Sequence, residues 1–220
     1  MKKLIALLLA LVMVIGLAAC GNKNETPDNG NNQEQNDTNN NENNEGNENN
    51  EGTNEGEGEQ AGTTVESAVG VLEAIWGLYA EDEKFFVMGG DMNNIVDNAP
   101  GAYSLEDVET LGVQLLVPAE EVSKITEAAS LFHGMMLNNF TCGVFKVAEG
   151  VDAAAFAETM HNAVANAQWM CGMPEMELVA VIGGEYVLMC FGINDAVNPF
   201  QGKLVEAFPD AQVLYSQAIG

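Results

Sequence analysis

The sequence predicts an α+β domain whose C-terminal half is a ferredoxin-like βαββαβ unit with one antiparallel sheet. Three observations predict it. From residue 140 onward, short apolar runs and helical patterns follow each other as strand, helix, strand, strand, helix, strand. The runs 178–182 and 186–191 are joined by Gly183-Gly184-Glu185, a hairpin signal. The strands are apolar on both faces, which indicates that both faces of the sheet are covered.

The other elements of this half follow from local signals. A strand over 140–147 ends at Glu149-Gly150. A helix is expected over 152–170, because Asp152 suits a helix start and one face then carries only apolar residues, namely Phe156, Met160, Val164, Ala167 and Cys171. Asn198-Pro199 favours a helix over 198–208, and a last strand is expected over 211–216. Ferredoxin-like connectivity places both helices on the same face of the sheet.

The N-terminal half of the domain is expected to be helices and loops that cover the second face of the sheet. Apolar residues recur at helical spacing over 64–80. Residues 88–103 contain Gly89-Gly90 and Pro100-Gly101 and are expected to form a loop. Short helices are expected near Ser104 and after Pro118.

Two segments precede the domain. Residues 1–19 have a positive start and then an apolar run from Leu4 to Leu17, the layout of a secretory signal. One alternative is a spanning helix, but it needs about 20 apolar residues. The other is an ordinary signal in which Cys20 is accidental, but Leu17-Ala18-Ala19 fits its small-x-small cleavage site poorly. Residues 21–62 hold eleven acids, one lysine and many Asn and Gly residues, so with Cys20 they are expected to form a disordered acidic tether over 20–62. Residues 63–220 have the length of a single globular domain.

The end of the signal resembles the bacterial lipobox. Leu17-Ala18-Ala19 precedes Cys20, and Gly21 follows it. The resemblance implies that Cys20 becomes the lipid-bearing first residue of a mature lipoprotein on the outer face of the cell membrane. Two acyl chains anchor a protein stably, whereas one does so only marginally. Attachment is therefore expected to depend on Cys20.

The domain also resembles a group of uncharacterised surface lipoproteins from gut clostridia that share a domain of unknown function. Besides the lipobox and the tether, the resemblance is carried by Asn138-Asn139-Phe140, by Phe145-Lys146-Val147, by the Asp152 helix and by residues 184–188. It covers roughly the last hundred residues. It implies a Gram-positive surface lipoprotein, with no assigned activity and no catalytic residues.

The charge of the chain excludes some partners and favours others. The formal net charge is −26, and residues 63–220 carry 22 acidic side chains against four lysines, a net of −18. No arginine occurs in the chain. Nucleic acids and anionic lipid head groups would be repelled, and the residue best suited to bidentate phosphate binding is missing. Cations, or a cationic partner, are the expected electrostatic counterparts.

Few residue patterns indicate chemistry. His133 and His161 are the only histidines, and no catalytic or zinc motif surrounds them, so both are expected to be structural or exposed. Asp91, Asn93 and Asp97 form the one cluster that resembles a calcium site, although its spacing is not that of an EF-hand loop. A plain polar loop is the other interpretation, and no cofactor is indicated.

The sulfur-containing residues support structural interpretations. Cys142 and Cys190 are expected on neighbouring strands and facing one way, either as a disulfide or as two buried thiols. The chain has eleven methionines, including Met135-Met136, Met170 and Met173, and these are expected to fill the core.

The sequence favours a lipid-anchored, non-enzymatic surface module that binds an unknown ligand, either a surface protein or a small molecule. A small extracytoplasmic hydrolase using carboxylates is the alternative, and a two-lobed solute receptor is a third reading that 158 residues hardly accommodate. Carboxylates converging in a deep pocket, one with a raised pKa, would favour the enzyme. A shallow apolar surface would favour the binding module.

Overall fold

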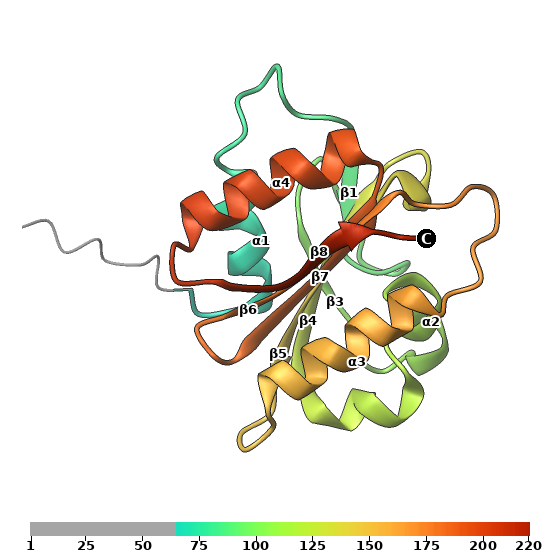
Figure 1. The fold of residues 1–220 in the computed structure, drawn as a ribbon, viewed down its shortest axis with the longest axis vertical. Helices are drawn as coiled ribbons and strands as arrows, with labels where there is room; N and C mark the ends of the chain where they lie inside the picture. Colours follow the sequence, from blue (N-terminus) through green and yellow to red (C-terminus); the bar gives the residue numbers. More distant parts are fainter. Residues whose placement is uncertain (1–64) are drawn as a thin grey trace, which may run out of the picture. The chain divides into compact units, whose positions relative to one another are not determined.

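The computed structural model describes residues 65–220 (Figure 1). The predicted signal, Cys20 and the tether lie outside the described residues. The helices are α1 (Ala68–Trp76), α2 (Val108–Gln114), α3 (Ala153–Ala165) and α4 (Asn194–Ala207), with 3₁₀ turns η1 (Ala119–Lys124) and η2 (Leu137–Asn139). The strands are β1 (Val87–Gly89), β2 (Val96–Asp97), β3 (Gly101–Tyr103), β4 (Ile125–His133), β5 (Phe140–Val147), β6 (Met176–Ile182), β7 (Tyr186–Gly192) and β8 (Gln212–Ala218).

All eight strands belong to one antiparallel sheet; seven follow the order β2-β1-β4-β5-β7-β6-β8, and β3 joins the sheet by pairing with β4. The short strands β1 and β3 share one edge of β4: β1 pairs with residues 131–133 and β3 with residues 128–130. The predicted α+β class and the antiparallel sheet are therefore confirmed.

The ferredoxin-like order of the last four strands is wrong. β5 and β7 are antiparallel neighbours, as expected. However, a ferredoxin-like unit would pair the last strand with the first, and β8 instead pairs with β6. The place beside β5 is taken by β4, a nine-residue strand that the sequence analysis missed. Because β4 occupies the free edge of β5, β8 can pair only at the opposite edge of the sheet, beside β6.

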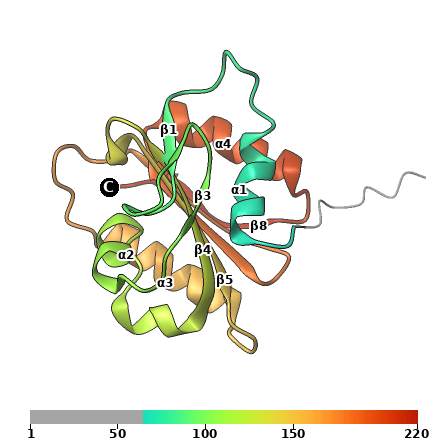
Figure 2. The same cartoon turned by 180° about the vertical axis from the view of Figure 1, so that it is seen from behind.

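This difference also moves one helix. The connections β5-α3-β6 and β7-α4-β8 each cross one strand in the same direction along the sheet, but β5 and β7 run in opposite directions. Because such crossovers are right-handed, their helices must lie on opposite faces. The prediction that both helices share a face is wrong: α4 lies beside α1, and α3 lies across the sheet with α2 (Figures 1 and 2).

Each face of the sheet has its own hydrophobic core. One core packs α1 and α4 over residues such as Val144 and Leu188. The other packs α2 and α3 over residues such as Phe145 and Val187. Successive side chains of β5 and β7 point to opposite faces of the sheet, so each strand contributes residues to both cores. The N-terminal half therefore covers both faces and adds β4, rather than covering only the second face as predicted.

Several element boundaries differ from the predicted ones because tertiary contacts override local signals. Residues 88–103 contain β1 to β3 rather than a plain loop. The helix expected from residue 198 begins at Asn194 and contains Pro199, because Ala196 and Val197 are buried against the sheet. Within residues 65–220, none of the helices is both long and apolar enough to span a bilayer.

Candidate binding groove

An open groove of about 630 Å³ lies on the α2 and α3 face of the sheet. Its walls come from the end of α2 and the segment after it, from η2, and from the end of α3 with the loop that follows. The lining residues that matter below are Val113, Leu116, Leu137, Trp169, Met170 and Phe191. The volume lies within the usual range for ligand sites, and the lining is mainly apolar.

The two helices of the groove begin at aspartate caps. The Asp107 carboxylate accepts a hydrogen bond from Thr110 N at 3.0 Å, and the Asp152 carboxylate accepts from Ala154 N at 2.9 Å. Such caps satisfy backbone N–H groups that have no partner inside the helix. Leu111 of α2 and Val164 of α3 are buried and fix each helix on the sheet. The groove is the space left between the two helix ends.

The third wall is a turn at residues 169–172 that is fixed by contacts with residues distant in the sequence. Trp169 packs on Phe191 with ring centroids 4.8 Å apart. Cys171 and Gly172 have positive φ angles of 63° and 112° and reverse the chain. Asn138 Nδ2 donates to the carbonyl oxygens of Met170 at 2.9 Å and of Gly172 at 2.6 Å. This amide therefore fixes the turn that presents Met170.

The groove exposes apolar side chains that a core would normally bury. Val113 is 74% exposed and Met170 is 78% exposed. Met135, Met136 and Met173 are also exposed, so the prediction that these methionines fill the core is wrong. Exposed apolar side chains gathered in one place are typical of interaction sites.

Each of the four lysines among residues 65–220 lies within ion-pair distance of at least one glutamate. Lys84 and Lys124 contact Glu81 and Glu121 at 2.7 and 2.8 Å. Lys203 lies 3.8 Å from both Glu83 and Glu206.

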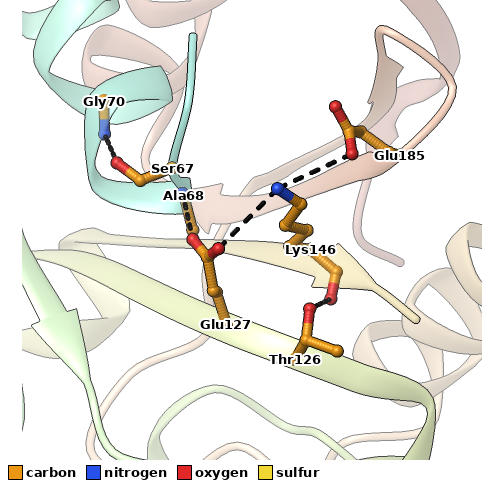
Figure 3. A network of polar contacts seen from close by, with 7 residues as sticks. All are labelled: Ser67, Ala68, Gly70, Thr126, Glu127, Lys146 and Glu185. Atoms are coloured by element: carbon orange, nitrogen blue, oxygen red, sulfur yellow. Dashed lines mark hydrogen bonds and ion pairs between the residues drawn. The ribbon is translucent and has the colours of Figure 1, made fainter. Parts of the chain in front are cut away.

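Lys146 lies in a polar network at the start of α1 (Figure 3). Its Nζ is 3.7 Å from both Glu127 Oε1 and Glu185 Oε2. The other Glu127 oxygen accepts a hydrogen bond from Ala68 N at 3.0 Å. The described surface therefore offers an anionic ligand no free ammonium group.

In the predicted calcium cluster, the carboxylate of Asp91 is bound by its own loop. Asp91 is buried, and its carboxylate accepts hydrogen bonds from the backbone N–H groups of Asn93, Asn94 and Ser104 at 2.8 to 3.1 Å. Asp97 lies on β2, opposite Met88 of β1. No group of three or more His, Cys, Asp or Glu residues within 65–220 is arranged to hold a metal ion. In this structure Asp91 organises its loop.

The pocket beside Asp91 bears on the hydrolase alternative. It has a volume of about 330 Å³ and is also lined by Glu106, Asp107 and Tyr103. Burial raises the pKa of Asp91, but the hydrogen bonds to its carboxylate outweigh that effect and hold the pKa below its usual value. Hydrogen bonds from Thr110 likewise lower the pKa of Asp107. Both groups are stabilised as carboxylates, the opposite of what a general acid needs.

Cys142 and Cys190 lie directly opposite each other on β5 and β7, and both side chains are buried. Val147 N donates to Glu185 O at 2.8 Å, and ladder bonds alternate, so the cysteines form a non-hydrogen-bonded pair. The Cα atoms of such pairs are about 4.5 Å apart, within disulfide range. Burial and the neighbouring Cys142 raise the pKa of the Cys190 thiol. The placement on one face is confirmed, and the disulfide stays a prediction.

The two histidines have structural contacts. His133 Nδ1 accepts from Met135 N at 3.2 Å and closes a turn. His161 Nδ1 lies 2.9 Å from Oε1 of Glu177, a β6 residue that is only 2% exposed. The His161 ring also stacks on Tyr215 at 3.8 Å. The burial of Glu177 cannot be predicted from the sequence, because nothing local marks an acid at the start of an apolar strand as buried.

The comparisons with known proteins add no relative. The chain matches no family model, no curated protein and no solved structure.

Proposed function

We propose that this chain is a lipid-anchored surface protein of the cell membrane whose domain binds a partner through the groove between α2 and α3. The observation that carries the proposal is the exposure of Val113 and Met170 in an apolar groove. When a partner covers apolar side chains that are exposed to water, the free energy of the system falls by about 25 cal/mol per Å² of buried apolar area. The hydrogen bonds that lower the pKa values of Asp91 and Asp107 make both side chains unsuitable as general acids in the second pocket.

The anchoring part of the proposal rests on the sequence. Cys20 follows a signal-like segment, and the acidic domain has no basic patch for anionic lipid. The likeness to lipoproteins of gut clostridia supports the same location.

Cys20→Ser is expected to abolish lipidation, because the thiol is the acceptor of the lipid. The variant chain would be shed or would persist as an uncleaved precursor, while residues 65–220 fold normally. Growth with a labelled fatty acid followed by membrane fractionation measures this. Label on the serine variant, or its absence from the wild type, would contradict the anchoring proposal.

A pull-down from the cell surface tests the binding part. The wild-type chain is expected to capture a surface component that a Val113→Gln, Met170→Gln double variant does not. Val205→Gln is the matched control, because Val205 is also exposed but lies on α4, across the sheet from the groove. Equal capture by all three chains would exclude the groove as the binding surface.

A further inference from the structure

We infer that the partner segment received by the groove is a basic amphipathic helix, with lysine or arginine side chains flanking an apolar face. This inference rests on the proposed function of the groove and adds the chemistry of its occupant.

The apolar face of the occupant is required by the lining. Val113, Leu137 and Met170 are exposed, while Phe191 is buried at the base of the groove. Methionine is flexible and polarizable and adapts to irregular apolar surfaces. Met135 and Met136, directly before Leu137, extend the exposed apolar surface along the chain. A partner without an apolar face would leave this surface wet.

The helical form of the partner segment is inferred from the elements that make up the walls of the groove. The lining residues belong to α2, α3, η2, the connecting segments and β7. β7 is paired on both sides, by β5 and β6, so none of these residues offers a free strand edge to an extended peptide. Helix-in-groove binding needs only apolar anchors on one side of the partner helix.

The positive charge of the occupant follows from the surface around the groove. Glu109 lies four residues before Val113, on the same side of α2, and Glu120 directly follows the lining residue Ala119. Both are exposed, and neither forms an ion pair with a described lysine. Each described lysine already contacts a carboxylate. A domain with a net charge of −18 attracts a cationic segment and repels a second copy of itself.

Backbone strain independently marks the groove. Among residues 65–220, three non-glycine residues have positive φ, and one of them is Asn98, a residue type that tolerates it. The other two are Leu116, a lining residue with φ of 56°, and Cys171, which follows the lining residue Met170. Strained backbone of this kind gathers at ligand-binding segments. Surrounding contacts hold these strained segments; the Asn138 hydrogen bonds to Met170 and Gly172 do so for the turn that contains Cys171.

The test uses three labelled peptides of about 18 residues, or about 27 Å of helix. One is a leucine and lysine amphipathic helix. The second has glutamate in place of every lysine, and the third has the first composition with its leucines dispersed around the helix. Fluorescence anisotropy with the full chain carrying Cys20→Ser gives the affinities, and Trp169 emission reports contact at the groove. The other tryptophan, Trp76, is buried on the opposite face.

The lysine amphipathic peptide is expected to bind at least about tenfold more tightly than either other peptide and to weaken as salt is added. Val113→Gln with Met170→Gln should lower its affinity by about tenfold, whereas Val205→Gln should not change it. Urea midpoints of the variants confirm that they are folded.

Equal binding of the glutamate peptide would overturn the inferred charge and leave the groove as a binding surface. Weak binding of all three peptides, with groove-dependent capture in the pull-down, would overturn the helix inference alone. Binding that the groove variants do not weaken would overturn both the inference and the proposed function. A concentration-dependent dimer that Met170→Gln disrupts would identify a second copy as the occupant and overturn the inference.

Discussion

Replacing His161 with alanine is expected to lower the free energy of unfolding by about 3 kcal/mol, because it leaves the buried polar side chain of Glu177 without the imidazole that lies 2.9 Å from it. Glu177 is 2% exposed, and its Oε2 atom has no hydrogen-bond partner among residues 65–220. The substitution also removes the stacking of His161 on Tyr215. Urea unfolding followed by circular dichroism measures the change.

The double variant His161→Leu, Glu177→Leu separates the effect of a buried polar group without a partner from the effect of lost packing. Replacing a buried pair with apolar residues is often neutral, so this variant should recover most of the stability lost by His161→Ala. Glu158→Gln, at an exposed position of the same helix, is the control and should change stability by less than about 0.5 kcal/mol. A double variant as unstable as His161→Ala would show that lost packing, not the polar group left without a partner, causes the loss of stability.

The second large effect is expected at Gly89, where Gly89→Ala should destabilise the domain by about 3 kcal/mol or more. A Cβ atom at this position would overlap the backbone of Ala99, Pro100 and Gly101, at the point where β1 and β3 meet along β4. These are backbone atoms, which cannot move aside as the end of a flexible side chain would. Thermal unfolding of the variant and the wild type gives the difference.

Gly202→Ala is the matched control and should have the opposite sign. Gly202 lies inside α4, and a Cβ atom there would meet no atom within 4 Å. Alanine in an exposed helix interior is more stable than glycine by about 0.5 to 1 kcal/mol. If Gly89→Ala is tolerated as well as Gly202→Ala, then β1 and β3 do not meet closely along β4.

The sequence predicts well the elements whose signals are local. The strand over 140–147 has the observed bounds, and the hairpin at Gly183-Gly184 joins β6 and β7 as expected. What it could not predict was competition between distant segments. In the sequence, nothing marks β4 off from the segment that follows Pro118. In the structure, β4 pairs with the edge of β5 that a ferredoxin-like unit would pair with its last strand.

The candidate site was largely hidden for the same reason. Val113, Leu116 and Trp169 come from separate elements, and only the packing of α2 and α3 on one face brings them together. The apolar character of the methionines predicts that they lie in the core, although Gly172, two residues after Met170, marks a turn, where side chains are often exposed. The acidic charge of the domain, by contrast, could be counted directly, and it carries the inference about a basic partner.

The most direct test of the groove as the binding surface is site-specific photo-cross-linking on intact cells. A photoreactive amino acid at position 113 or 170 samples the groove, and the same residue at position 205 samples the far face of the domain. We predict covalent adducts of defined mass from positions 113 and 170 and none from position 205. Adducts of equal yield at position 205, or no adduct from either groove position, would contradict the proposal that this groove is where the protein binds its partner.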